Sequence, residues 1–221
     1  MILLVNYAGI DVRLFAEQLA RDLDKPFAEQ DVKHGEIETF CESNAVDMLI
    51  VTCQNKTQQL QKALNACRSL RIPYLILTPD MQIKPIEKDD EILIPVTMFE
   101  EEQSKAQIAT SFGRFCGTRT TLVQANDYGT RAAKNVGKIT ALIEKFSLPY
   151  KTIIGKRDSY KVEAEAQSYA DTDTRMIVIS ASRDYGIDDL LFGPKERHIL
   201  QKAALPVLLL NPRGDLYSLC D

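Results

Sequence analysis

The sequence predicts an α/β fold made of two tandem three-layer α/β/α domains with mainly parallel sheets. Two observations predict it. Short apolar runs of strand length alternate with segments of helical period, the order that is typical of βαβ units. A Pro-bounded apolar stretch also occurs twice, as IPYLILTPD at residues 72–80 and as LPVLLLNPR at residues 205–213. Because such runs have almost no polar face, we expect helices to cover both faces of each sheet.

The first half of the chain shows each element by its apolar pattern. MILLV and MLIV are continuous apolar runs, as buried strands require. Apolar residues at helical spacing, such as Val12, Phe15 and Leu19, mark the helices. We therefore expect strands at 1–5, 27–32, 48–51 and 74–78, and helices at 12–23, 35–44 and 57–70.

The second half begins after a polar, Pro-containing segment, DMQIKPIEKDD, which reads as a linker. The same alternation then restarts with the strand ILIPV. A long segment with Ala132, Val136, Ile139 and Ile143 on one side is the clearest helix. We expect strands at 92–96, 120–124, 150–154, 176–179 and 207–210, and helices at 101–115, 130–146, 160–170 and 194–203.

The composition fits a globular protein and argues against several classes. The chain has 221 residues, 45% of them hydrophobic and 26% charged, with a net charge of −4 and no cluster of Lys and Arg, so nucleic acid is not an expected partner. The apolar runs are too short to span a bilayer, and the start MILLVNYAG reads as a strand and not as a signal peptide. Five Cys without metal-binding spacing and two His indicate reduced thiols in a cytoplasmic protein, with no metal site.

An internal repeat is the strongest pattern in the sequence. MLIVTCQNKTQQLQKALNACRSLRIPYLILTP parallels MIVISASRDYGIDDLLFGPKERHILQKAALPVLLLNP, each a Met-headed strand, a loop, a helix and the Pro-bounded strand. Chance similarity of two α/β segments is the alternative. The first copy is shorter, since 67 positions separate Asn6 from Pro73 and 109 separate Thr97 from Pro206. We infer the loss of about one strand-plus-helix unit, the second strand and its helix.

The second half resembles a universal stress protein domain. The resemblance covers residues 91–213, through the opening strand ILIPV and above all through the closing segment RMIVISASRDYGIDDLLFGPKERHILQKAALPVLLLNPR. The first half resembles the family only through the repeat. The resemblance implies a tandem, Rossmann-like protein with a shortened domain at 1–80, a linker at 81–90, a full domain at 91–213 and a tail at 214–221. It also implies that strands 74–78 and 207–210 pair antiparallel, which would make one chain a pseudo-dimer, with homodimerisation a further possibility.

Nucleotide-binding members of the family hold ATP with an Asp after the first strand and with a loop of the form G-x2-G-x9-G-S/T. The Asp position falls on Thr97, and on Asn6 in the first half. The loop positions fall on Ser180, Arg183, Gly193 and Pro194, so that only one glycine remains. Side chains stand where phosphate needs room, and Pro has no N–H to donate. The sequence therefore predicts no bound cofactor, ATP included, and identifies Gly193-Pro194 as a helix start.

The other candidate residues have plain structural interpretations. Arg183 with Asp184 suits a solvated ion pair, and His198 a helix surface. Cys53 follows a strand end, where a redox role is conceivable, but an inert buried thiol is the simpler interpretation. The acidic run 100–102 suits the first turn of a helix, and RGD at 213–215 is a short match in a tail.

Three functions remain open on the sequence alone. The preferred hypothesis is a non-catalytic tandem stress-type protein that acts through a protein partner or a small ligand. An adenine-nucleotide-binding regulator with a rearranged phosphate loop is the alternative. An enzyme such as a nucleotidyl transferase would need an HIGH-like or P-loop signature, and neither motif is present.

Overall fold

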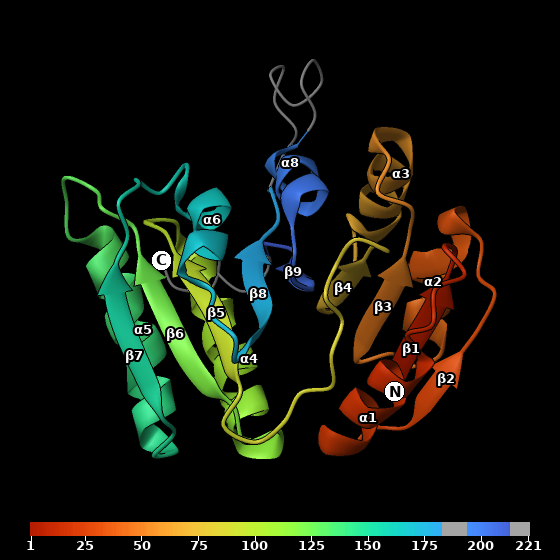
Figure 1. Ribbon diagram of the computed structural model, residues 1–221, viewed down its shortest axis with the longest axis horizontal. Helices are drawn as coiled ribbons and strands as arrows, with labels where there is room; N and C mark the ends of the chain where they lie inside the picture. The colour runs from red at the N-terminus through yellow and green to blue at the C-terminus, as the bar shows by residue number, and fades with distance from the viewer. Residues whose placement is uncertain (183–193, 213–221) are drawn as a thin grey trace.

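A computed structural model describes residues 1–182 and 194–212 (Figure 1). Its nine strands form one sheet in the order β2-β1-β3-β4-β9-β8-β5-β6-β7. The mainly parallel α/β fold that the sequence predicts is thus confirmed, with the strands joined in a single sheet. The strands are β1 (Ile2–Asn6), β2 (Phe27–Glu29), β3 (Met48–Thr52), β4 (Tyr74–Leu77), β5 (Glu91–Val96), β6 (Arg119–Gln124), β7 (Tyr150–Ile154), β8 (Thr174–Ser180) and β9 (Val207–Leu210).

All neighbouring strands run parallel except at one junction. There β4 and β9 pair antiparallel, with Tyr74 opposite Leu209, Leu75 opposite Leu208 and Ile76 opposite Val207. These strands are the two Pro-bounded stretches of the sequence. Each also pairs in parallel with the Met-headed strand of its own half, β4 with β3 and β9 with β8. The junction therefore joins β1–β4 and β5–β9 into one continuous sheet.

The two halves of the sheet differ by one edge strand. In the second half the order outward from the junction is β9-β8-β5-β6-β7, and in the first half it is β4-β3-β1-β2. The strand next to β1 is present, since β2 pairs with Ile2, Leu3 and Leu4. The first half lacks a counterpart of β7, so our inference that the second strand was lost is wrong. An edge position is the physically easier one to lose, because no strand pairing inside the sheet is broken and only the new edge strand, β2, has a single neighbour.

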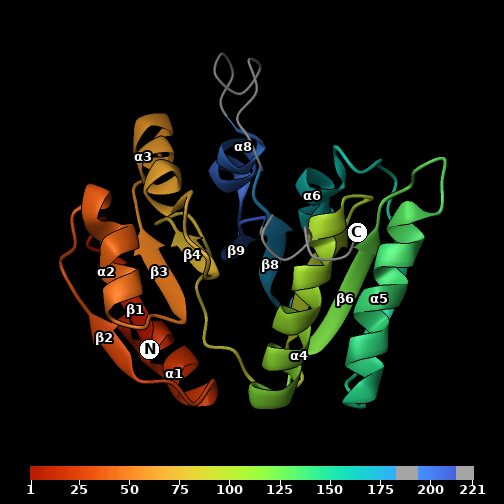
Figure 2. The same ribbon diagram turned by 180° about the vertical axis from the view of Figure 1, so that it is seen from behind.

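Helices cover both faces of the sheet. Figure 2 shows α4 and α5 in front of the strands, whereas α6 and α8 lie in front in Figure 1. Across the junction α3 packs beside α8, and the side chain of Gln201 on α8 donates to Thr57 Oγ1 at the start of α3, at 2.9 Å. The helices described are α1 (Arg13–Asp22), α2 (Ile37–Ser43), α3 (Thr57–Cys67), α4 (Lys105–Phe115), α5 (Arg131–Lys145), α6 (Val162–Glu165) and α8 (Lys195–Lys202).

Three of the predicted helices are partly 3-10 turns. These are η1 (His34–Glu36) before α2, η2 (Glu100–Ser104) before α4 and η3 (Ala166–Tyr169) after α6. Strand β2 is also shorter than predicted, with three residues that are all only half-buried. The central strands are buried throughout, as their apolar runs require. Within residues 1–182 and 194–212, no helix has the length and apolar character needed to cross a membrane.

Candidate functional site

The candidate site lies at the carboxyl ends of β5 and β8. These strands are neighbours in the sheet, and the chain leaves them toward opposite sides, to β6 from β5 and to β9 from β8. Open α/β sheets bind ligands at such a switch point. Two of the residues predicted for a nucleotide site, Thr97 and Ser180, come together here at the two strand ends, and both are buried.

Glu102 of η2 lies across this switch point. One of its carboxylate oxygens, Oε2, accepts the backbone N–H of Thr97 at 3.0 Å, and the other, Oε1, accepts the hydroxyl of Ser180 at 2.9 Å. The residue is only 1% exposed. The Glu102 carboxylate therefore bridges the two strand ends and occupies one hydrogen-bond donor at each of them.

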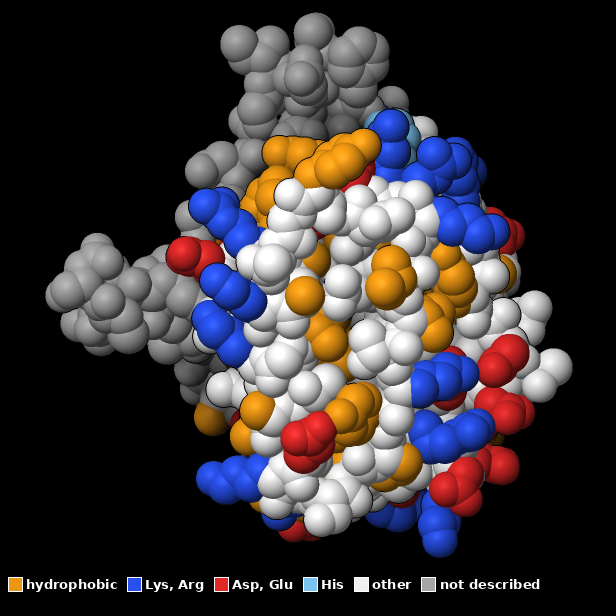
Figure 3. All heavy atoms as spheres, turned by 90° about the vertical axis from the view of Figure 1, so that its left-hand side faces the viewer, with side chains coloured by type: hydrophobic (Ala, Val, Ile, Leu, Met, Phe, Trp, Pro, Cys, Tyr) orange, Lys and Arg blue, Asp and Glu red, His pale blue; other side chains and the backbone are white. Residues whose placement is uncertain are grey.

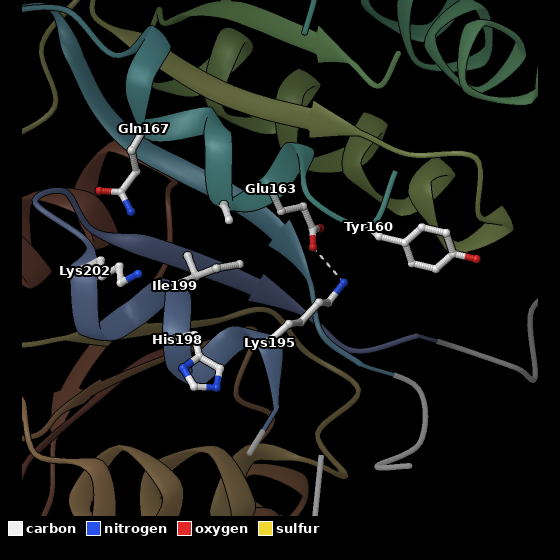
Figure 4. Close-up of a pocket in the computed structure, with 8 residues that line it drawn as sticks. Tyr160, Glu163, Gln167, Lys195, His198, Ile199 and Lys202 are labelled. Carbon is white, nitrogen blue, oxygen red and sulfur yellow. Dashed lines mark hydrogen bonds and ion pairs between the residues drawn. The ribbon is translucent and has the colours of Figure 1, made fainter. Parts of the chain in front are cut away.

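Glu163 of α6 accepts the remaining hydrogen-bond donor at these strand ends, the backbone N–H of Ser180. Its Oε1 accepts the backbone N–H of Ser180 at 2.9 Å, and its Oε2 forms an ion pair with Lys195 Nζ of α8 at 2.7 Å (Figure 4). Lys105 of α4 completes the group and is 0% exposed. Its Nζ donates to Pro95 O at 2.6 Å and pairs with Glu102 at 2.8 Å and with Glu163 at 3.4 Å. We call Glu102, Lys105, Glu163 and Lys195 the buried ion cluster, which Lys195 joins from the surface with a side chain that is 38% exposed.

In the buried ion cluster, the opposite charges of Glu163 and Lys195 stabilise each other's ionised form. Burial alone would raise the pKa of Glu163, but Lys195 and Lys105, together with the Ser180 N–H, hold that pKa below its ordinary value. Burial alone would likewise lower the pKa of Lys195, and the Glu163 carboxylate outweighs it and raises that pKa. Two carboxylates and two ammonium groups thus balance in charge. A buried pair that is complete costs little, whereas one that loses a partner costs several kcal/mol.

Pro194 begins α8 and is buried. It has extended backbone angles, φ −66° and ψ 152°, and its carbonyl accepts the N–H of Arg197 at 3.0 Å. This geometry fits the predicted helix start and leaves no N–H at this position for a ligand. The other two predicted loop residues, Arg183 and Gly193, lie outside the described residues.

Glu196 follows Pro194 at the start of α8. Its Oε1 accepts the backbone N–H of Ser182, and its Oε2 is buried with no hydrogen-bond partner among the residues described. Burial raises the pKa of this carboxyl above its ordinary value. Unlike Glu163, it forms no ion pair with any of the described residues, and the attraction of Lys195 does not offset its burial.

The side chain of Thr97 serves the local turn. Its Oγ1 accepts the N–H of Phe99 at 3.3 Å, and its carbonyl accepts the side-chain amide of Asn135 at 2.9 Å. In the first half, Asn6 at the equivalent strand end donates to Ile10 O at 3.0 Å and accepts the hydroxyl of Thr52 at 2.6 Å. Both positions therefore have their polar groups engaged within the protein.

The buried ion cluster is absent from the sequence-based prediction. The acidic run 100–102 forms the first turn of a helix, as predicted, in the 3-10 helix η2, but the burial of Glu102 in that turn was not foreseen. One signal was available in the sequence. Glu102 and Lys105 are three positions apart at the start of an apolar helix face that continues with Ala106 and Ala109, so both were placed to face the core.

The remaining candidates take structural roles where they are described. Cys53 is buried, and burial raises the pKa of its thiol to about 11, so that it stays protonated at neutral pH. His198 is exposed on α8, as expected. The pair Arg183–Asp184 and the RGD stretch lie outside the described residues. In the part of the chain that is described, no group of three His, Cys, Asp or Glu side chains could hold a metal ion.

Solved structures with the same fold include universal stress proteins. One from Pseudomonas aeruginosa UCBPP-PA14 is 16% identical, with a TM-score of 0.57 over 99% of this chain and 84% of that chain. One from Archaeoglobus fulgidus DSM 4304 is 15% identical, with a TM-score of 0.58 over 96% of this chain and 85% of that one. A protein of unknown function from Pseudomonas aeruginosa PAO1 is 17% identical, with a TM-score of 0.57 over 99% of this chain and 84% of that one.

No protein-family model matches the sequence, and no curated protein matches it. The chain therefore has a universal stress protein-like fold over almost its whole length.

Proposed function

We propose that this chain is a non-catalytic tandem protein of the universal stress type that acts in a stress response by binding a protein partner or a small ligand, without binding ATP. One observation carries the proposal. The backbone N–H groups of Thr97 and Ser180, at the strand ends where a nucleotide would bind, are accepted by the carboxylates of Glu102 and Glu163.

The electrostatics of this arrangement oppose an anionic ligand. A phosphate group at a switch point relies on free N–H donors and on positive potential. Here the donors are used by carboxylates, and Lys105 and Lys195 are neutralised by the same two groups. The loop that follows, residues 181–193, adds Asp184, Asp188 and Asp189 against one Arg183. This excess of negative charge in the neighbouring sequence disfavours a triphosphate.

The second part of the proposal is that the halves of the chain are repeats and form a pseudo-dimer. Equivalent hydrogen bonds support it. Leu49 N–H donates to Pro73 O at 3.1 Å, and Ile177 N–H donates to Pro206 O at 3.0 Å. Five residues beyond each Met, Cys53 N–H donates to Leu77 O at 3.0 Å and Ala181 N–H to Leu210 O at 2.9 Å. The same strand pair is built twice at the same offsets, and the copies meet at β4 and β9. The domain division at residues 80 and 91 follows from this repeat.

Isothermal titration calorimetry with ATP and Mg²⁺ tests the absence of nucleotide binding. We expect no binding tighter than about micromolar, roughly −8 kcal/mol. Each lost contact to a charged group costs about 1.5–3 kcal/mol, so a few losses remove most of such an affinity.

The alternative regulator predicts a different result. A micromolar isotherm that is lost in Arg183→Ala and kept in Arg21→Ala, an exposed arginine on α1, would show that the loop had been rebuilt around the arginine. That outcome would replace the proposal with an adenine-nucleotide-binding regulator.

A further inference from the structure

A groove runs between α6–η3 and α8, outside the switch point. Its deeper part has a volume of about 200 Å³ and is lined by Tyr160, Glu163, Lys195, His198 and Ile199, among others (Figure 4). A wider part of about 720 Å³ continues from it, and the two parts share Ala164, Gln167 and Lys202. The groove therefore has a narrow end and an open end.

The two ends of the groove differ in charge. At the narrow end the ammonium group of Lys195 is neutralised by Glu163 at 2.7 Å, and the side chains of Ile199 and Ala164 add apolar surface. Tyr160, which is 72% exposed, stands at the same end, with its ring edge against Phe99. This end suits the uncharged body of a ligand.

The open end carries uncompensated positive charge. It is lined by Arg157, Lys161 and Lys202, and none of the three forms an ion pair with any residue in the described ranges. The carboxylate at this end, Glu165, is already engaged, because it accepts the N–H groups of Lys156 and Arg157 and the hydroxyl of Tyr169. Figure 3 shows Lys and Arg side chains gathered at its upper right, toward the side that faces the viewer in Figure 1. Three cations against one occupied carboxylate attract an anionic group.

We propose that this groove binds a small organic oxyanion, a phosphate or carboxylate attached to a compact apolar or aromatic body. The oxyanion lies between Arg157, Lys161 and Lys202, and the body lies toward Ile199 and Tyr160. This inference rests on the proposal that the protein acts by binding a ligand. It places that ligand in a groove on the helix face, away from the carboxyl ends of β5 and β8.

The test uses phenyl phosphate as the probe, titrated into the full-length protein and followed by two-dimensional amide NMR. We expect saturable shifts confined to the amides of residues 157–169 and of α8. The variants Lys161→Gln and Lys202→Gln each weaken the affinity about tenfold, because each removes one charge-assisted contact. Lys138→Gln, an exposed lysine on α5, is the matched control and changes the affinity less than twofold.

Phenol, which has the ring without the charge, should bind at least tenfold more weakly than phenyl phosphate. Equal binding of phenol, equal weakening by Lys138→Gln, or no saturable shift at 10 mM probe would each overturn the assignment. Failure here is distinguishable from failure of the proposed function. The variants leave the buried ion cluster intact, and ATP calorimetry repeated on Lys202→Gln separates binding in the groove from binding at the switch point.

Discussion

At the scale of single residues, two buried glutamates of the same region have opposite electrostatic surroundings. Glu163 faces two ammonium groups and a backbone N–H, and its pKa is lowered. At Glu196 one carboxylate oxygen has no hydrogen-bond partner among the described residues, and burial outweighs the attraction of Lys195, so its pKa is raised. The ionised form is therefore favoured by folding at Glu163 and disfavoured by folding at Glu196.

This difference predicts opposite pH dependences for two matched variants. Ionised Glu163 stabilises the fold above the pKa of an unfolded glutamate, about 4.3, and the stabilisation is lost as the pH falls through the lowered native pKa. Glu163→Gln should therefore cost about 3–5 kcal/mol at pH 7 and much less in acid. For Glu196, stability is lost as the pH rises from about 4.3 through the raised native pKa. The unfolding free energy of Glu196→Gln should therefore rise relative to that of the wild type over that pH range.

Urea unfolding of both variants and the wild type at several pH values between 3.5 and 7.5 provides the measurement. The two differences in unfolding free energy should change with pH in opposite directions. A change in the same direction for both variants would contradict the assignment of their surroundings.

Residue-level prediction from the sequence succeeded only in part. Thr97 and Ser180 were assigned to one site through the resemblance to universal stress proteins, and the structure brings them together at two adjacent strand ends. The buried ion cluster was not foreseen, since Glu163 and Lys195 come from helices 32 positions apart whose packing no local pattern reveals. Acidic residues at a helix start also have a common solvated role, which concealed the burial of Glu102.

At the scale of elements, the β4–β9 junction is reinforced by the segment that follows each strand. Asn211, just after β9, donates from Nδ2 to Cys67 O at 2.7 Å and to Leu70 O at 2.9 Å, at the end of α3. The hydroxyl of Tyr74 donates to the same Asn211 side chain at 3.1 Å. On the other side, Gln82 N–H donates to Ala204 O, at the end of α8, at 2.8 Å. The second half therefore donates to carbonyls at and just after the end of α3, and Gln82 of the linker donates to a carbonyl just after the end of α8.

Asn211→Ala tests this reinforcement. It removes three hydrogen bonds, those that Asn211 donates to the carbonyls of Cys67 and Leu70 and the one that it accepts from Tyr74, so we expect a loss of about 1–3 kcal/mol in unfolding free energy. Asn65→Ala, on the exposed face of α3, is the control and should change stability by less than about 0.5 kcal/mol. Urea unfolding followed by circular dichroism measures both. A loss for Asn211→Ala no larger than that for Asn65→Ala would show that the junction depends on strand pairing alone.

Most elements could be predicted from the sequence, because a buried strand must be apolar along its whole length. The strand predicted at 48–51 is confirmed within β3, and the one predicted at 207–210 is confirmed as β9. The position of the missing unit could not be predicted, since chain length shows that a unit is absent but not which place in the sheet is empty. The 3-10 turns also escaped prediction, because the apolar spacing of short segments does not separate them from α-helix.

At the scale of the whole molecule, the junction removes two exposed edges. Strands β4 and β9 are buried on every residue, although each would be the end strand of its own half. Their pairing leaves β2 and β7 as the outer edges of the described sheet. Strand β2 has only three residues, and Lys25 and Pro26 precede it, features that discourage pairing with another chain. Strand β7 is longer and largely exposed.

Separation of the halves tests whether the junction is what makes the chain one unit. A fragment of residues 91–213 would expose the β9 edge and the apolar surface around Leu208. Antiparallel pairing of β9 with the same strand of a second copy would give the edge its hydrogen-bond partners and bury that surface. We therefore expect it to sediment as a dimer in analytical ultracentrifugation. A fragment of residues 1–80 keeps four strands, one of them short, and buries too little apolar surface for a stable domain, so it should be poorly folded or self-associated. Mixed together, the fragments should form a one-to-one complex, since pairing of β4 with β9 restores the contacts between α3 and α8 that the β9 dimer lacks. A stable, monomeric 1–80 fragment, or a 91–213 fragment that remains monomeric at all concentrations, would mean that each half is complete without the other.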